Sequence, residues 1–124
     1  MSWLTILAVG IGGAIGALCR SKATTYLKLH TTGTFPLPTL IVNLTSCFIA
    51  GVLLFFAAGM DQTAYLGLTM GFLGGFSTLS TMNYEAVELM FAGHARTSLT
   101  YLATSYLSTL GAAALGFALA ALVA

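Results

Sequence analysis

Asn43 places an amide in a mainly apolar stretch that begins Thr39-Leu40-Ile41-Val42. If this stretch crosses a membrane, the carboxamide needs hydrogen-bond partners, because a polar group left unpaired in hydrocarbon costs several kcal/mol. Two roles would provide them. The amide can bond to a neighbouring helix and hold two spans together, or it can turn its NH₂ donor toward a permeating anion. The residue alone leaves both roles open.

A second polar feature is the stretch 71–82, GFLGGFSTLSTM, in which paired glycines precede four hydroxyl residues. Each Gly in a helix interior costs about 1 kcal/mol relative to Ala, so the stretch predicts a broken helix. At membrane depth such a break is tolerated only where protein or an ion-filled cavity surrounds it. The freed carbonyls suit a cation, and the freed N–H groups and hydroxyls suit an anion. The alternative is a glycine packing face with hydroxyls bonded back to their own helix.

The third feature is a stripe of hydroxyls formed by Tyr101, Ser105 and Thr109, with Thr104 and Ser108 beside it. Spacings of three and four place these side chains on one face of a helix. A continuous ladder over two turns is typical of a wet track for an ion. Ordinary hydrogen bonding within the helix explains the same residues, so both interpretations stay open.

The remaining titratable residues do not suggest catalysis. Glu85 and Glu88 share a helix face near the end of a span, where a solvated or vestibule position is expected. His30 and His94 lie in connections without metal-ligand partners. Because the sequence contains no nucleophile–base pair, phosphate loop or cofactor fingerprint, we predict that the protein is not an enzyme.

Composition identifies the setting of these residues. Of the 124 residues, 58% are apolar and 6% charged, whereas a soluble domain carries about a quarter charged residues. The net charge of +1 is too small to recruit nucleic acid. Cys19 and Cys47 show no disulfide or zinc spacing and are interpreted as small membrane-helix residues. The sequence therefore predicts an all-α integral membrane protein.

Four stretches are apolar and long enough to span a bilayer, which takes about 20 residues, or about 17 at the short end. We expect a single four-span domain covering 1–124, with the third span broken near mid-membrane. The predicted spans are approximately 3–19, 37–58, 64–91 and 98–124.

The basic residues predict an orientation. Four spans place both termini on one side, and all the Lys and Arg residues fall in the first and third connections on the other side: Arg20, Lys22, Lys28 and Arg96. By the positive-inside rule these connections are cytoplasmic and the termini are outside.

Glycines recur at spacings that allow helices to approach closely. Gly12 and Gly16 form one pair, and Gly67, Gly71 and Gly75 form a ridge along the third span. Tight packing of four helices leaves no obvious lumen within one chain, so we expect any pathway to lie between chains.

Three motifs together resemble a known family. The stretch 12–20, GGAIGALCR, is similar to its opening G-G-x-x-G-A-x-x-R. Residues 39–43 match its T-L-x-V-N, and residues 71–82 resemble its G-F-x-G-G-x-T-T-F-S-T-F. With four spans in about 125 residues, this is the pattern of the Fluc (CrcB-type) fluoride channels, and the resemblance covers nearly the whole chain.

The resemblance implies a fluoride channel in the membrane of a prokaryotic cell. In that family two antiparallel subunits form a dimer with two fluoride pores at the subunit interface and a buried structural sodium ion. By position, the backbone carbonyls of Gly74 and Ser77 would bind the Na⁺, while Glu85 and Arg20 would lie in the vestibule. The positions that fall on or beside the fluoride pore are Asn43, Leu79, Ser80, Thr81, Met82, Tyr101, Ser105 and Thr109.

Two features depart from the family pattern. Leu79 and Met82 occupy positions where the family has phenylalanines whose positive ring edges face the anion. The basic residues are also biased to one side, whereas an antiparallel homodimer needs a chain that inserts both ways. The alternatives to a homodimeric channel are a heterodimer with an oppositely oriented paralogue, or a structural subunit with a non-conducting pore. A small four-span drug exporter is less favoured, because residues 3–19 contain no acid.

Overall fold

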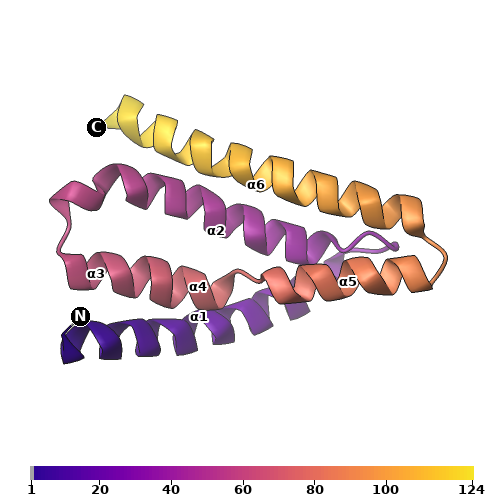
Figure 1. The fold of residues 1–124 in the computed structure, drawn as a ribbon, viewed down its shortest axis with the longest axis horizontal. Coiled ribbons are helices and arrows are strands. Elements are labelled where there is room, and N and C mark those ends of the chain that lie inside the picture. The colour runs from indigo at the N-terminus through magenta and orange to yellow at the C-terminus, as the bar shows by residue number, and fades with distance from the viewer. Residues whose placement is uncertain (1) are drawn as a thin grey trace.

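The structure is a computed structural model that describes residues 2–124, and in this range it is a bundle of helices without strands (Figure 1). The predicted all-α fold is confirmed. The elements in chain order are α1 (Trp3–His30), α2 (Leu37–Phe56), the 3₁₀ turn η1 (Ala57–Gly59), α3 (Gln62–Leu66), the π-helix η2 (Gly67–Leu73), α4 (Gly74–Phe76), α5 (Leu79–Phe91) and α6 (Ala95–Val123).

Helix α1 continues well beyond the predicted end of the first span at Cys19. The chain stays helical through Arg20 and Lys22 to His30. Residues 20–30 contain neither Gly nor Pro, and the hydroxyl of Thr24 donates to the Arg20 carbonyl at 2.8 Å, so nothing here interrupts the helix. The basic residues therefore mark a change in polarity and not the end of the helix.

The predicted starts of the second and fourth spans agree with the structure more closely. Helix α2 begins at Leu37 with prolines on either side, and its 20 residues extend about 30 Å, the thickness of a hydrocarbon core. Helix α6 begins at Ala95, three residues before the predicted span. Among residues 2–124, three helical stretches are long and apolar enough to cross a membrane: Trp3–His30, Leu37–Gly59 and Ala95–Val123. The chain is a multi-pass membrane protein.

The third predicted span is broken, as expected. Ser77 and Thr78 both adopt extended backbone, with ψ of 161° and 119°, and they separate α4 from α5. The residues before the break are π-helical from Gly67 to Leu73, which the sequence did not predict. Elements α3, η2, α4 and α5 together form what is called here the third segment.

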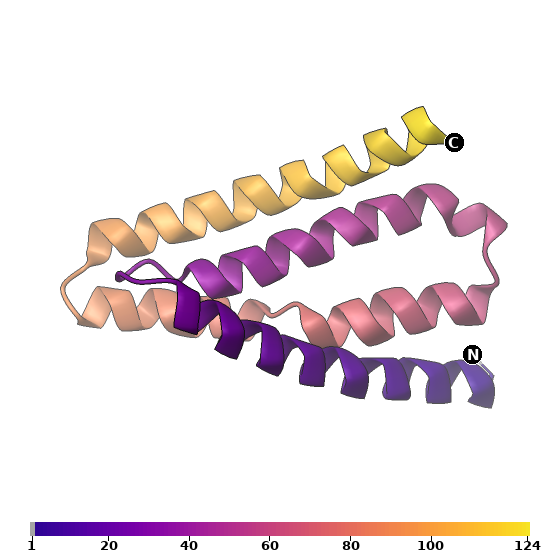
Figure 2. The same ribbon diagram turned by 180° about the vertical axis from the view of Figure 1, so that it is seen from behind.

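Glycines bring α1 and the first half of the third segment into backbone contact, and Figure 2 shows α1 lying along this segment. A Cβ added at Gly16 would overlap the Phe72 carbonyl, and one added at Gly75 would overlap the Gly13 carbonyl. The expected close packing of these glycines is confirmed. Because only a residue without a side chain fits, the glycine spacing fixes how α1 docks.

Both termini lie at one end of the bundle, as predicted (Figure 1). The α1–α2 and α5–α6 connections lie at the opposite end, near the basic residues. A small core fills this basic end and holds α2, α5 and α6 together; its buried members are Leu40, Met82, Ala86, Leu89 and Tyr101.

Candidate functional site

Asn43 bonds to both backbone groups of Thr78 at the break. Its Nδ2 donates to the Thr78 carbonyl at 3.0 Å, and the Thr78 N–H donates to its Oδ1 at 2.8 Å. Both residues are only 8% exposed. The amide thus performs the first of its two expected roles, an interhelical bond. One Nδ2 hydrogen remains for another acceptor, since an amide carries two.

The same bonds account for the break. In a continuous helix the N–H of Thr78 would donate to the Gly74 carbonyl, and the N–H of Thr81 to the Ser77 carbonyl. Here the first donates to Asn43, and the second donates to the Thr78 hydroxyl at 3.1 Å, which caps α5. The carbonyls of Gly74 and Ser77 have therefore lost their helical donors, and these are the two carbonyls that the resemblance assigns to a cation.

A cavity of about 180 Å³, called here the break cavity, lies on the α6 side of Thr78. It contains the amide of Asn43, hydroxyls and several apolar side chains. Its lining residues are Asn43, Cys47, Ser77, Thr78, Leu79, Met82, Ser105, Tyr106 and Thr109.

The hydroxyl stripe of α6 divides into residues with different surroundings. Ser105 is 1% exposed, lines the break cavity, and its Oγ has no hydrogen-bond partner. Thr109 lines the same cavity but donates to the Ser105 carbonyl at 2.6 Å. Ser108, beside the stripe, donates to the Thr104 carbonyl of its own helix. Of the stripe residues that line the break cavity, Ser105 is thus the one whose hydroxyl is still available to a ligand.

Tyr101, at the basic end of the stripe, is fully buried and donates from its hydroxyl to Glu85 Oε1 at 3.2 Å. The ring of Phe35 meets the Tyr101 ring edge-on, with centroids 5.4 Å apart. Three residues before Tyr101 on α6, Ser98 Oγ donates to the Ala86 carbonyl at 2.7 Å. These contacts hold α5 against α6 and fix the position of the Glu85 carboxylate.

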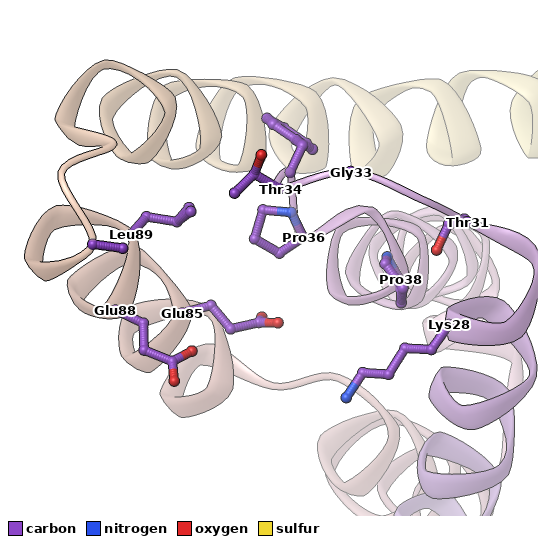
Figure 3. Close-up of a pocket in the computed structure, with 11 residues that line it drawn as sticks. Lys28, Thr31, Gly33, Thr34, Pro36, Pro38, Glu85, Glu88 and Leu89 are labelled. Atoms are coloured by element: carbon purple, nitrogen blue, oxygen red, sulfur yellow. The ribbon is translucent and has the colours of Figure 1, made fainter.

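Glu85 lies between two further cavities. The outer cavity, of about 520 Å³, opens at the basic end, and Figure 3 shows the side chains of Lys28 and Glu85 pointing into it, with Glu88 at its edge. The inner cavity, of about 80 Å³, also contains Lys28 and Glu85. Its lining residues are Arg20, Thr24, Lys28, Thr39, Thr78, Thr81 and Glu85.

The three cavities adjoin one another, because neighbouring cavities share lining residues. Lys28 and Glu85 line both the outer and the inner cavity, and Thr78 lines both the inner and the break cavity. A row of cavities thus runs from the basic end to the break, with the Asn43–Thr78 pair between the last two, and the break cavity has the most apolar lining of the three. Within one chain this pair closes the row.

The predicted site residues do not all reach these cavities. Arg20, Glu85 and Thr81 line the inner cavity, whereas Ser80 is exposed and lines none of the three. The two residues at the family's phenylalanine positions differ in exposure. Met82 is 3% exposed and belongs to the core, while Leu79 is 59% exposed.

Two residues of the site were missed from the sequence. Lys28 follows Arg20 and Thr24 at spacings of four, which places the three on one helix face, but the predicted span ended before it. From the sequence, Thr78 was interpreted only as one of the four hydroxyl residues in the stretch 71–82, and its role at the start of α5 was not predicted. A Thr directly before a helical run is a preferred N-cap, and that signal indicates where α5 begins.

Residues 7–117 match the family model described as CrcB-like protein, Camphor Resistance (CrcB). The chain is 43% identical over 104 residues to a protein of Lactobacillus delbrueckii subsp. bulgaricus named fluoride-specific ion channel FluC 2, covering 82% of this chain and 86% of that one. It is 38% identical to the protein of the same name from Moorella thermoacetica, covering 94% of each chain. It is 39% identical to fluoride-specific ion channel FluC 1 of Carboxydothermus hydrogenoformans, covering 81% of this chain and 80% of the other.

Proposed function

This chain belongs to the CrcB family, and from that premise we propose that it is a subunit of a fluoride-selective channel that exports fluoride passively. Its relatives are named as ion channels, so the family is not a family of enzymes. The observation that carries the proposal is the broken third segment, with Asn43 holding the break between the inner cavity and the break cavity.

The chemistry of fluoride explains the arrangement. Fluoride is small and strongly hydrated, so a pore must replace its water shell with hydrogen-bond donors. Donors of this kind gather beside the break: the remaining Nδ2 hydrogen of Asn43, the unpaired Ser105 hydroxyl and the hydroxyl of Thr81. At the basic end, Arg20 and Lys28 offset the negative charge of Glu85 and favour entry of an anion.

Two antiparallel chains would complete the pores. Asn43 and Thr78 close the row of cavities within one chain, while Gly74 and Leu79 are exposed beside the break and free to meet a second chain. We place the two fluoride pores at this interface, in the plasma membrane. The positive-inside rule puts the basic end of this chain in the cytoplasm, and the antiparallel partner then has its corresponding end outside. Fluoride then leaves the cell passively, driven by its concentration gradient and by the membrane potential.

The Gly74 and Ser77 carbonyls fit a structural Na⁺. Both have lost their helical donors, and unwound backbone carbonyls are ligands that membrane proteins use for this ion. Two chains would contribute four such oxygens at the dimer interface. The bound ion supplies positive charge that offsets the carbonyl dipoles of the two breaks.

A second candidate is a heterodimer partner or structural subunit whose own pore does not conduct. Leu79 and Met82 support it, because neither side chain offers the positive ring edge of a phenylalanine to an anion. In this case an oppositely oriented paralogue provides the aromatic residues. The small drug exporter is not retained, since the relatives are named as channels.

Fluoride efflux from liposomes distinguishes these candidates. The chain is reconstituted alone and then with a neighbouring paralogue, and fluoride and chloride release are followed with ion electrodes. Fluoride release without chloride release from the chain alone supports a homodimeric channel. Release only with the paralogue supports the heterodimer, and no fluoride release in either case, with dimers intact by cross-linking, refutes the channel.

Cross-linking between two chains tests whether the break lies at the interface. Gly74→Cys is introduced in a background in which Cys19 and Cys47 are replaced by serine, so that a disulfide can form only between the two introduced cysteines. Cross-linking there supports the shared Na⁺ site, whereas monomers at every protein concentration contradict it.

A further inference from the structure

A cavity of about 450 Å³ lies between the α1–α2 connection and the first turns of α6, outside the row described above. One wall is the connection from Thr32 to Phe35, and the other is α6. The residues that line it are Thr32, Gly33, Thr34, Phe35, Arg96, Thr97 and Thr100. It is called here the Arg96 cavity.

The Arg96 cavity is suited to an anion. It contains one guanidinium and four threonine hydroxyls, and no acidic residue lines it. Glu85 and Glu88 line the outer cavity instead, on the other side of the Gly33–Phe35 connection, which Figure 3 shows running past Pro36. The connection thus separates a cavity that contains two glutamates and a lysine from one whose only charged residue is Arg96. A guanidinium offers two parallel donors, which match the geometry of a phosphate group.

The depth of the cavity is that of lipid head groups. Helix α2 extends about 30 Å, the hydrocarbon thickness, and it begins at Leu37, directly after the connection that forms one wall. The other wall belongs to α6, whose 29 residues extend about 43 Å and so reach beyond the hydrocarbon. Arg96 therefore lies where the phosphates of the bilayer are concentrated.

An apolar stripe continues from the cavity along α6. Leu107 and Leu110 are 73% and 70% exposed, and with Ala103 they follow Arg96 and Thr100 at spacings of three and four. The cavity and the stripe thus lie next to each other on one helix face, where they can contact the polar head group and the apolar tail of one lipid. A soluble phosphate would contact the cavity alone.

We propose that the Arg96 cavity binds the phosphate of an anionic membrane lipid, with the acyl chain along the exposed stripe of α6. The Arg96 guanidinium donates to the phosphate oxygens, and the threonine hydroxyls donate to the remaining head-group oxygens. The site shares Gly33, Thr34 and Phe35 of the connection with the outer cavity. Arg96, Thr97 and Thr100 line none of the three cavities described above, so Arg96 can be changed without altering their lining.

The test measures lipid binding by the full chain in a neutral detergent. Phosphatidylglycerol or phosphatidylcholine is added in mixed micelles, and the lipids retained by each chain are counted by native mass spectrometry. We expect one phosphatidylglycerol per chain to be retained in preference to phosphatidylcholine. Arg96→Gln should weaken this binding about tenfold and Arg96→Lys less, since lysine keeps the charge but loses the paired donors.

Lys22→Gln is the matched control, because it removes one exposed positive charge from the same end of the bundle without touching the cavity. It should change the affinity less than twofold, and unfolding temperatures without lipid should agree among all variants. Equal weakening by Lys22→Gln and Arg96→Gln would show diffuse surface charge and overturn the proposal. Equal retention of the two lipids, or displacement of phosphatidylglycerol by millimolar inorganic phosphate, would also overturn it.

Discussion

The two halves of the third segment are attached to the bundle in different ways. Before the break, Gly67, Gly71 and Gly75 face α1: Gly71 and Gly75 lie against its backbone, and Gly67 lies against Ala8. After the break, α5 is held by side chains, through the Ser98 bond to Ala86 and the packing of Met82 in the core. The first contact admits almost no change in shape, whereas the second can adjust by rotamer changes.

This difference indicates which half positions the site. The glycine-packed half is held rigidly against α1, and the extended residues Ser77 and Thr78 connect it to α5. Asn43 of α2 then fixes Thr78 from a third direction. The break is therefore located by one steric contact and one pair of hydrogen bonds, and each can be removed separately.

The largest expected effect comes from breaking the steric contact. Gly16→Val places a side chain into the Phe72 carbonyl, so α1 must separate from the third segment. We expect a loss of about 3 kcal/mol or more in the free energy of unfolding, as for severe overpacking. Thermal unfolding in detergent measures it.

Gly10→Val is its control, because nothing lies within 4 Å of a Cβ at Gly10. The control should keep its stability to within about 1 kcal/mol, the range of helix propensity. A similar loss in both variants would mean that the β-branched residue, and not the helix contact, is responsible.

A smaller effect is expected when the hydrogen-bonded pair is removed. In Asn43→Leu the side chain keeps nearly the same shape, but the Thr78 N–H and carbonyl are left unpaired. We expect this to lower the free energy of unfolding by about 1 to 3 kcal/mol. Unfolding measurements should show this loss, and fluoride efflux from liposomes should fall steeply. Asn43→Asp keeps the acceptor for the Thr78 N–H and should recover part of the stability.

If Asn43→Leu abolished flux without loss of stability, the amide would serve the ion and contribute little to the fold. If stability fell and flux persisted, the interhelical bond would be its whole role. Both outcomes would sharpen the distinction between the two expected functions of this residue.

The smallest effect should come from the adjustable half. Tyr101→Phe removes the hydroxyl bond to Glu85 but keeps the edge-on contact with Phe35. Hydrogen bonds between membrane helices average about 0.6 kcal/mol, so the free energy of unfolding should fall by about that amount. Thermal unfolding measures this, and a loss as large as that of Gly16→Val would refute the proposed difference between the halves.

Several features of the site were predictable because local chemistry decides them. Paired glycines followed by hydroxyls predicted the break, and glycines every four residues predicted the close approach of α1. Helix α1 extends to His30, past the predicted end of the first span at Cys19, because the prediction placed the end of the span by polarity, whereas a helix continues as long as its residues favour it. With that end at Cys19, Lys28 was treated as part of a loop and its place in the inner cavity was missed.

By itself the sequence determined the composition of a membrane protein, the helical segments and the position of the break, since these depend on neighbouring residues and on transfer into lipid. Only the tertiary structure decided that both polar atoms of Asn43 are used on Thr78, and that Lys28 and Glu85 share a cavity. Asn43 and Thr78 are 35 residues apart, and the choice among many possible partners for an amide is made by how the helices dock. That docking depends on the shapes of whole helix faces, which no single stretch of residues specifies.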